Sequence, residues 1–382
     1  MKVLHLIESM GHGGAEWLVV EHVRHAGPGV ESLVCAVNRG GAALEAAAAL
    51  GARTFVLDKV EKRAFAVRRL AGLLRDERID VVNGHNPVGG LYAALAALGS
   101  RETAVFRTEH SVHYGGRHSP IYPLLETLST AVTRRVVCVC QAVLESHVRR
   151  MPWAARRFVT VANGISPAPH TRPRDTVRRE MGIAPEDRIA LTIGSLTPAK
   201  AQHVLIESFA WIAPRVPRAR LWIAGEGRLG GALEEQIRRA GLEDRVRWLG
   251  ARTDAADLMA ASDAFVLSSV REGLPVTVLE AMRAGRPVVA TDAGGTAEAV
   301  EDGVTGRIVP MRDPAALGAA LGDVLGDPER AERMGRRGRE RWARDFTAER
   351  MVRETEALYQ AERRVIQPAS SARVLGDPRA TP

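Results

Sequence analysis

Two glutamates separated by seven residues are the strongest candidates for chemistry in this chain. Glu272 and Glu280 follow an apolar, strand-like run at Ala264–Leu267. Glu272 precedes an expected helix and Glu280 lies about one turn inside it, so both carboxylates could accept hydrogen bonds from hydroxyl groups of a ligand. The alternative is a solvated loop charge at Glu272 and an ordinary helix ion pair between Glu280 and Arg283.

The segment between the two glutamates is typical of a helix N-terminus that meets an anion. Pro275 suits the first turn of a helix, where its missing N–H costs nothing. Gly273 lets the backbone come close to a ligand. The amides of Leu274, Val276 and Thr277 would then point out of the helix N-terminus, which is a site for a diphosphate.

A serine and a lysine follow the first strand-like run of the second half, Ile189–Gly194. Only four of the 53 basic residues are lysines, and Lys200 is the only one after residue 62. A lysine in so arginine-rich a chain indicates a need for a compact ammonium, for which a phosphate oxygen is the natural partner. Chance is the alternative. Ser195 belongs to the same turn and is expected to meet the same ligand.

Glycines and histidines follow strand-like runs of the first half. Gly13 and Gly14 open a helix and offer backbone amides to a phosphate or sugar, although they do not complete the Gly-x-Gly-x-x-Gly of dinucleotide-binding proteins. His110 follows the run Ala104–Thr108 and can reach the crevice beyond the sheet. A locally satisfied loop histidine is the alternative. His85 occupies a similar place after an earlier run.

The chain lacks the usual signature of a metal-held diphosphate. No Asp-x-Asp sequence occurs, and sugar-nucleotide enzymes that hold a diphosphate through a divalent metal usually need such paired carboxylates. We therefore expect no metal and no cofactor, with the phosphate charge neutralised by helix N-termini and by lysine or arginine. Three cysteines are too few for a disulfide framework, and an odd number cannot all pair.

The chain is basic, with a net charge of +8, and residues 1–165 carry an excess of six basic residues. A nucleic-acid partner is disfavoured because no basic helix with interleaved aromatic residues occurs. The stretch 59–70 is basic and somewhat amphipathic if helical, which is typical of contact with an anionic membrane. A solvated helix is the alternative. With no secretion signal and no membrane-spanning run, we expect a cytoplasmic protein that can lie at the inner face of the membrane.

Both halves of the chain alternate short apolar runs with helical patterns, which predicts an α/β protein with two doubly wound parallel sheets. The expected strands are Val3–Ile7, Ser32–Val37, Thr54–Leu57, Asp80–Asn83, Ala104–Thr108 and Val136–Val139 in the first half, and Ile189–Gly194, Arg220–Ala224, Val246–Leu249, Ala264–Leu267 and Val288–Thr291 in the second. In such sheets ligands bind beyond the carboxyl ends of the strands, which is where the candidate residues fall.

The seam between the two halves is expected near Asn163-Gly164, a strong turn signal that precedes a Pro- and Arg-rich stretch. This division gives Rossmann-like domains at 1–165 and 166–345. A helix is expected at 346–366, and a disordered tail rich in Pro, Ser and Ala at 367–382.

The whole pattern resembles family 4 of the retaining, metal-independent glycosyltransferases, whose GT-B fold has two Rossmann-like domains facing each other across a cleft. The most specific element is the segment from Glu272 to Glu280, which is similar to the Glu-x7-Glu motif of the family. Further motifs occur in the family's order and spacing: Gly13-Gly14, Gly194-x5-Lys200 and Gly225-Glu226-Gly227. The resemblance implies that the first domain binds the acceptor, the second binds the nucleotide sugar, and the C-terminal helix crosses back to the first.

The resemblance also implies a role for the candidate residues. Glu280 would hold the ribose hydroxyls, while Glu272 and His110 would contact the donor sugar near the reacting carbon. Lys200 would neutralise the diphosphate, so Glu272, His110 and Lys200 form the expected catalytic set. The expected nucleotide-sugar site comprises Gly13, Gly14, Ser195, Lys200, Gly225, Arg252, Glu272, Gly273, Leu274, Pro275, Val276, Thr277 and Glu280.

One position departs from the family pattern. Ser195 stands where the family often has a second cation, an arginine, beside the lysine. The charge of the diphosphate would then have to be balanced by another group, and Arg252 or Arg271 is the expected substitute.

The expected reaction transfers a hexose from a UDP-sugar, with GDP-mannose as the second choice, to a hydroxyl of a glycan, a lipid-linked glycan or a natural product. The acceptor hydroxyl is expected to attack from the face that the diphosphate leaves, with retention at the anomeric carbon. Two other functions stay open: a non-catalytic sugar-nucleotide-binding scaffold subunit, and a GT-B-type sugar-nucleotide epimerase. The paired glutamates favour transfer over both.

Overall fold

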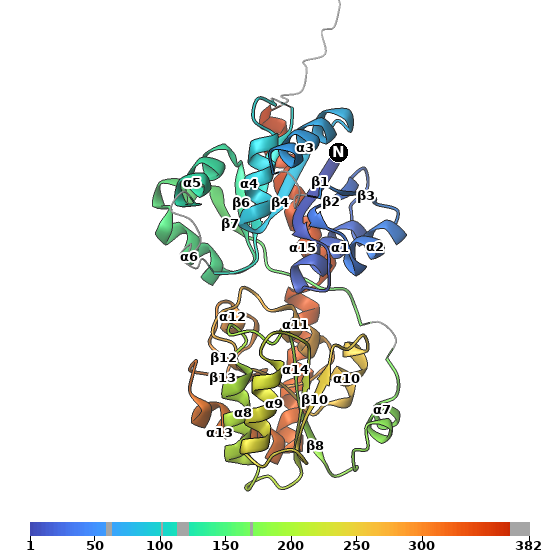
Figure 1. The fold of residues 1–382 in the computed structure, drawn as a ribbon, viewed down its shortest axis with the longest axis vertical. Coiled ribbons are helices and arrows are strands. Elements are labelled where there is room, and N and C mark those ends of the chain that lie inside the picture. Colours follow the sequence, from blue (N-terminus) through green and yellow to red (C-terminus); the bar gives the residue numbers. More distant parts are fainter. Residues whose placement is uncertain (59–62, 101, 113–121, 169–170, 367–382) are drawn as a thin grey trace, which may run out of the picture.

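The computed structural model describes residues 1–58, 63–100, 102–112, 122–168 and 171–366. Within these residues the chain forms a seven-stranded and a six-stranded sheet, one in each half of the molecule (Figure 1). All strand pairs in both sheets are parallel. The prediction of two doubly wound parallel sheets is therefore confirmed. The predicted tail at 367–382 and residues 59–62 of the basic stretch lie outside the described residues.

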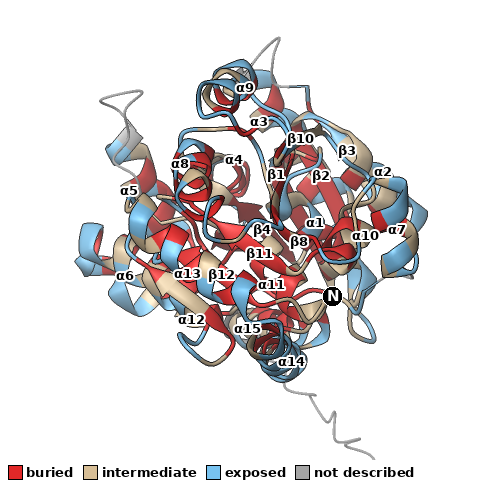
Figure 2. Ribbon diagram, turned by 90° about the horizontal axis from the view of Figure 1, so that it is seen from below, coloured by how far each residue is buried: buried red, intermediate tan, exposed pale blue. Residues whose placement is uncertain are grey.

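The first sheet has the strand order β3-β2-β1-β4-β5-β6-β7. Its strands are β1 (Lys2–Ser9), β2 (Glu31–Arg39), β3 (Arg53–Val56), β4 (Val81–His85), β5 (Ala104–Glu109), β6 (Arg135–Cys138) and β7 (Phe158–Thr160). The helices between them are α1 (Gly14–Arg24), α2 (Ala42–Ala49), α3 (Arg63–Asp76), α4 (Asn86–Ala96), α5 (Tyr122–Val132) and α6 (Gln141–Arg150), followed by the 3-10 helix η1 (Pro152–Arg157). Both faces of the central part of the sheet are buried, since separate apolar clusters cover them. The central strands β1, β2 and β4 are largely red in Figure 2, whereas the edge strand β3 is not. Burial on both faces explains why these strands are continuous apolar runs.

The second sheet has the order β10-β9-β8-β11-β12-β13. Its strands are β8 (Arg188–Ile193), β9 (Ala219–Ala224), β10 (Val246–Gly250), β11 (Ala264–Leu267), β12 (Val288–Thr291) and β13 (Gly306–Val309). Its helices are α7 (Arg174–Glu180), α8 (Gln202–Ile212), α9 (Gly230–Arg239), α10 (Ala255–Ala261), α11 (Val276–Arg283), α12 (Thr296–Ala299), α13 (Pro314–Gly326) and α14 (Pro328–Asp345). The order reverses between β8 and β11, so the crevice expected for a ligand lies beyond these two strands.

Two strands were missed from the sequence, and several others extend one or more residues beyond their predicted bounds. The outermost strands β7 and β13 have only three and four residues, too short for a clear pattern. The strand β4 runs on to His85, whereas the sequence analysis ended it at Asn83. His85 therefore belongs to the sheet and is fully buried, which corrects its expected position in a loop.

The last helix, α15 (Ala348–Ile366), leaves the second sheet and packs against the first, as the resemblance implied (Figure 1). Its Tyr359 is buried against β5, with the ring 4.7 Å from that of Phe106 in an edge-on arrangement. The Asn83 side-chain amide donates a hydrogen bond of 2.8 Å to the Tyr359 hydroxyl. No helix in the described part of the chain is long and apolar enough to cross a membrane.

Candidate active site

The N-termini of two helices meet where the two halves of the molecule touch. The helix α1 begins after Gly13, and α11 begins after Pro275. A Cβ atom added to Gly14 would lie 3.2 Å from Cγ2 of Val276, so the two helix starts are in direct contact. Neither helix is capped by the side chain of its N-cap residue. Because a helix N-terminus carries unpaired N–H groups and partial positive charge, two of them together favour a bound anion.

Glu272 is held by two donors from the second half of the chain. The Nζ atom of Lys200 lies 2.6 Å from Oε1 of Glu272, and the hydroxyl of Ser269 donates to the same oxygen at 2.6 Å. The Glu272 side chain is 9% exposed and that of Lys200 is 23% exposed. Both donors contact the same oxygen, and no hydrogen bond to Oε2 is found among the described residues, so Oε2 can accept a bond from a ligand hydroxyl. The sequence analysis missed Ser269, because no motif distinguishes it from other serines.

The backbone at Gly273 is enclosed on two sides. A Cβ atom on Gly273 would overlap the carbonyl group of His110 from the first half of the molecule. On the other side, the amide of Gly295 donates to the Gly273 carbonyl oxygen at 2.7 Å. Gly294 has φ +58° and no room for a side chain against the Glu272 carbonyl. Glycine is therefore required at 273 by close backbone approach, and at 294 by both space and conformation.

His110 lies at the end of β5 and is bound to other polar groups of the first half. Its Nε2 atom is 2.9 Å from Nδ1 of His85, and its backbone amide donates to Oδ1 of Asn86 at 3.2 Å. Burial lowers the pKa of His110 to about 3, with a smaller effect from the nearby His22. His110 is therefore a neutral imidazole at neutral pH.

Glu280 lies on the second turn of α11, as expected, but it does not form the ion pair that was the alternative. The nearby Arg283 instead donates through Nη1 to the carbonyl oxygen of Ser166 at 2.8 Å. Burial raises the pKa of Glu280, and Arg283 partly offsets this effect. The Glu280 side chain lines a cavity of about 290 Å³ between α10 and α11, together with Arg283 and Arg286.

The loops beyond β8, β9 and β10 hold the remaining candidates. Gly225 has φ +136° and packs against the carbonyl group of Gly194, so the two loops touch. Ser195 is exposed. Arg252 makes two hydrogen bonds to Asp254, at 2.8 and 2.7 Å, and these hold the pKa of that carboxyl below its usual range. Arg252 is therefore already paired, and it would have to leave Asp254 to replace the family arginine.

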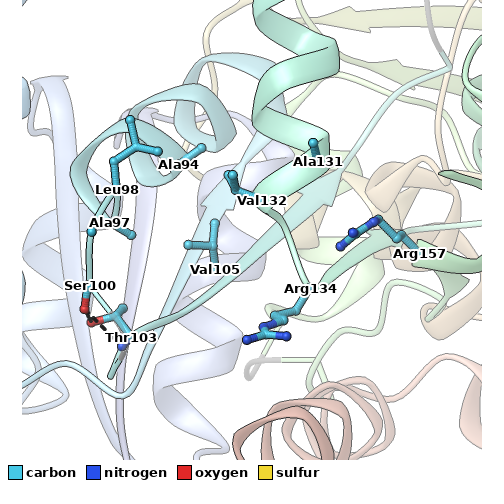
Figure 3. A pocket seen from close by; sticks show the side chains of 11 residues that line it. Ala94, Ala97, Leu98, Ser100, Thr103, Val105, Ala131, Val132, Arg134 and Arg157 are labelled. Carbon is cyan, nitrogen blue, oxygen red and sulfur yellow. Dashed lines mark hydrogen bonds between the residues drawn. The ribbon is translucent and has the colours of Figure 1, made fainter. Parts of the chain in front are cut away.

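The structure brings most of the predicted residues into one contiguous group. The contacts described above join Gly14 to Val276, Gly273 to His110, and Glu272 to Lys200. Glu280 lies one turn further along α11 than Val276, and Arg252 lies in the loop after β10. Among the described residues, no side-chain hydrogen bond joins Arg252 or Glu280 to this group. A second cavity, of about 310 Å³, lies at the other end of β5 between α4 and α5 (Figure 3) and contains none of the predicted residues.

Two family models match the chain: Glycosyltransferase Family 4 over residues 12–168, and Glycosyl transferases group 1 over residues 173–341. The glycogen synthase of Mycobacterium tuberculosis is 30% identical over 309 residues, which cover 77% of this chain and 71% of that protein. This chain belongs to the family 4, or group 1, glycosyltransferases. The transferase is also 29% identical to the putative glycosyltransferase EpsD of Bacillus subtilis over 313 residues, 77% of this chain and 80% of EpsD.

The GT-B fold of the glycosyltransferase is confirmed by solved structures. The structure of Anabaena HepE in complex with UDP superposes with a TM-score of 0.83 and 22% identity, covering 94% of this chain and 100% of HepE. The sucrose-phosphate synthase of Thermosynechococcus elongatus superposes with a TM-score of 0.80 and 18% identity, covering 95% and 99% of the two chains. At these identities the likeness concerns the fold.

Proposed function

We propose that this glycosyltransferase moves a hexose from a UDP-sugar to a hydroxyl acceptor, with retention at the anomeric carbon and without a metal ion. The observation that carries the proposal is the contact between the N-termini of α1 and α11 beside the Lys200–Glu272 pair. A diphosphate at this point would meet N-terminal amides of both helices and one ammonium, and it would take the place of the Glu16 carboxylate, which lies over Gly13 at the start of α1. HepE has been crystallised with UDP-glucose, which favours UDP over GDP as the nucleotide of the donor.

Each residue of the site has a distinct part in the proposed reaction. The Lys200 ammonium leaves Glu272 for the diphosphate, and the freed carboxylate accepts hydrogen bonds from hydroxyls of the donor sugar. Glu280 accepts hydrogen bonds from the ribose. His110, as a neutral imidazole, bonds to a hydroxyl of the donor sugar and orients it. Stabilisation of the charge on the departing UDP is then the largest catalytic contribution.

Bond making and breaking occur on one face of the sugar in this proposal. The bond between the anomeric carbon and the diphosphate oxygen breaks while the acceptor oxygen bonds to the same carbon. An oxygen of the leaving diphosphate takes the proton of the acceptor hydroxyl. The products are UDP and a glycoside of unchanged anomeric configuration, and no carboxylate becomes glycosylated.

A thermal-shift titration tests the donor site. UDP, GDP, TDP and ADP are compared with and without EDTA, on the wild type, on Glu280→Ala and on Glu329→Ala, which removes an exposed helix carboxylate. We expect UDP to raise the melting temperature in EDTA, and Glu280→Ala but not Glu329→Ala to abolish the rise. If GDP alone raised the melting temperature, the donor would be a GDP-sugar instead of a UDP-sugar. If the rise in melting temperature required Mg²⁺, the proposal of a metal-free site would be wrong.

Product analysis separates transfer from the two other functions. With UDP-glucose and a panel of hydroxyl acceptors, transfer yields UDP and a glycoside. An epimerase would yield an isomeric sugar, and a scaffold subunit would bind the donor without turnover. A glycosyl–Glu272 adduct in the mass spectrum would contradict front-face attack.

A peripheral contact with an anionic membrane is part of the same proposal, and the apolar surface of α4 and α5 supports it. Four large apolar side chains are exposed on these adjacent helices, Leu95, Leu124, Leu128 and Val132, and Leu98 is exposed in the turn after α4. The cavity between the helices also holds Arg134 and Arg157 (Figure 3). Apolar side chains beside arginines suit a surface of acyl chains and phosphate headgroups. In the part of the basic stretch whose side chains are described, 65–70, Phe65 is a large exposed apolar residue.

Vesicle sedimentation tests this contact. We expect the protein to sediment with vesicles that contain anionic lipid and not with neutral ones, and Leu124→Ser with Leu128→Ser to reduce the bound fraction several-fold. Arg68→Ser with Arg69→Ser on α3 is the matched control. If the α3 variant loses binding and the α5 variant keeps it, the membrane surface is the basic stretch predicted from the sequence.

A further inference from the structure

We propose that His5, His85 and His110 form a hydrogen-bonded chain with coupled tautomers. In this chain the buried His5 and His85 determine which ring nitrogen of His110 carries the proton. His5 and His85 are positioning residues in this inference. The coupling depends on the two ring-to-ring contacts and on the neutral state of the rings, and its use in catalysis rests on the proposed function of His110.

The three rings lie on neighbouring strands of the first sheet. His5 is on β1 and His85 ends β4, two strands that pair directly, and His110 follows β5, the next strand. The Nδ1 atom of His5 is 3.1 Å from Nε2 of His85, and the Nδ1 atom of His85 is 2.9 Å from Nε2 of His110. His5 and His85 are buried, with 2% and 0% exposure. The chain of contacts runs from the core of the sheet to its carboxyl edge.

All three rings are neutral at neutral pH. Burial lowers the pKa of His5 and of His85 well below the ordinary value for histidine, and it lowers the pKa of His110 to about 3. A neutral imidazole has one N–H donor and one bare nitrogen acceptor. Each contact between two rings therefore needs a donor from one ring and an acceptor from the other.

This requirement leaves only two arrangements of the protons. If His5 donates from Nδ1 to His85, then His85 must donate from Nδ1 to His110, and His110 must carry its proton on Nδ1. In the reverse arrangement all three rings carry the proton on Nε2, and His110 donates toward His85. Both arrangements give the three histidines the same tautomer, and a mixed set would leave two donors or two bare nitrogens facing each other.

The two arrangements differ in the group that His110 presents at its Nδ1 atom. The Nδ1 atom of His110 is buried and has no hydrogen-bond partner among the described residues. It is an N–H donor in the first arrangement and a bare acceptor in the second. A sugar hydroxyl can meet either group, because it both donates and accepts. A ligand that selects one tautomer of His110 would therefore shift the proton on His5, two rings away.

A fourth histidine provides a matched control. His22 of α1 stacks on His5, with ring centroids 4.9 Å apart. No side-chain hydrogen bond of His22 is found within the described part of the chain, so His22 shares the surroundings of the three rings without being a link between them. Its substitution should alter the packing at His5 and leave the coupling intact.

The tautomers can be observed directly by NMR. The full chain is labelled with ¹⁵N-histidine, and long-range ¹H–¹⁵N correlations identify the protonated ring nitrogen of each histidine at pH 7.5. Single substitutions assign the signals. We expect His5, His85 and His110 to share one tautomer, and we expect His5→Phe to shift the ring nitrogens of His110 while His22→Phe does not. Addition of UDP-glucose should move the His5 and His110 signals together.

Several results would overturn the inference. Opposite tautomers at His5 and His110, or a charged ring among the three at pH 7.5, would exclude the coupled chain in the wild type itself, without any variant. A folded His5→Phe protein with unchanged His110 nitrogens would also exclude it; if that variant does not fold, His85→Gln serves the same comparison. Shared tautomers without a response to UDP-glucose would support the chain and count against the proposed donor contact of His110.

Discussion

Lys200 and Glu272 neutralise each other at the centre of the site. Their contact of 2.6 Å joins the strand-end loop of β8 to the segment before α11. A partly buried ion pair tolerates the loss of one partner poorly, because the remaining charge is left without compensation. In the proposed reaction, the diphosphate replaces Glu272 as the partner of the ammonium. The pair thus keeps both groups in place before the donor binds.

We predict that Lys200→Gln lowers kcat/KM by about 10²- to 10³-fold, the usual effect of removing one group that stabilises developing charge. Lys200→Arg should recover only part of the activity, because a planar fork does not replace a compact ammonium at this distance from Glu272. Steady-state kinetics with UDP-glucose measures both. Lys2→Gln, which removes a surface lysine 3.7 Å from Glu31, is the control. A Lys200→Gln enzyme within threefold of the wild type would exclude the proposed role.

We predict that the fold loses stability in acid, because it contains buried histidines. Burial lowers the pKa of His22 to about 4 and that of His110 to about 3, while the unfolded chain titrates near 6.5. The unfolded state therefore binds more protons below about pH 6.5, and stability that is complete above this pH is lost as the pH falls toward 4. Each such histidine contributes up to about 1.4 kcal/mol per pH unit in this window.

Urea unfolding at pH 7.5, 6.5 and 5.5 measures this loss. His22→Phe should reduce the pH dependence of the unfolding free energy by about one proton, because the variant has no ring to protonate. The exposed His203→Asn serves as the control and should leave the slope unchanged. Equal slopes for His22→Phe and the wild type would contradict the neutral state of His22.

At the scale of elements, a carboxylate from one half of the molecule caps a helix of the other half. The Glu298 side chain on α12 accepts hydrogen bonds from the backbone amides of Gln141 and Ala142, both at 2.8 Å, at the start of α6. A carboxylate at a helix N-terminus satisfies unpaired N–H groups and complements the helix dipole. The contact thus ties the two halves of the molecule together.

We predict that Glu298→Gln weakens this contact by about 1 kcal/mol, because the amide keeps the shape of the side chain and loses its charge. The two halves should then separate more readily, which small-angle X-ray scattering would detect as a larger radius of gyration. Glu145→Gln, on the exposed side of α6, is the matched control, since the partner of Glu145 within the described residues is the side chain of Gln141 on the same helix. Identical scattering from the Glu298→Gln and Glu145→Gln proteins would argue against a closing role.

At the scale of the whole molecule, the chain crosses between the two halves twice, and the two crossings touch. The Ile165 amide donates to the Phe346 carbonyl oxygen at 3.0 Å, and the Ala348 amide donates to the Ile165 carbonyl oxygen at 3.2 Å. A side chain on Gly164 would overlap the carbonyl group of Thr347, which explains the glycine at the turn predicted from the sequence. Motion between the halves must therefore bend both crossings together.

We predict that Tyr359→Ala destabilises the first sheet by about 3–5 kcal/mol, the usual cost of removing a buried aromatic ring. The loss arises because α15 covers β5 with this side chain. Tyr359→Phe should cost only about 1 kcal/mol, the net value of one hydrogen bond from Asn83. Chemical denaturation measures both, with the exposed Gln360→Ala as the control. A small effect of Tyr359→Ala would show that the first sheet is stable without the crossing helix.

The sequence by itself determined the two parallel sheets and several of the segments that meet in the candidate site. The apolar runs are readable because parallel strands are buried on both faces. The helix start at Pro275 and the tight turn at Gly273 follow from backbone rules that act within a few residues. The strands β7 and β13 were not predicted, because three or four residues at a sheet edge are too few to show a clear apolar pattern.

Only the tertiary structure decided which of these segments meet. Gly14 and Val276 are far apart in the chain and touch because the two sheets face each other. The serine that holds Glu272, the carboxylate that caps α6 and the line of histidines behind His110 have no local signature, since each contact joins residues from different elements. Hydrogen bonds of this kind depend on distances of about 3 Å between side chains, and those distances exist only after the sheets have packed.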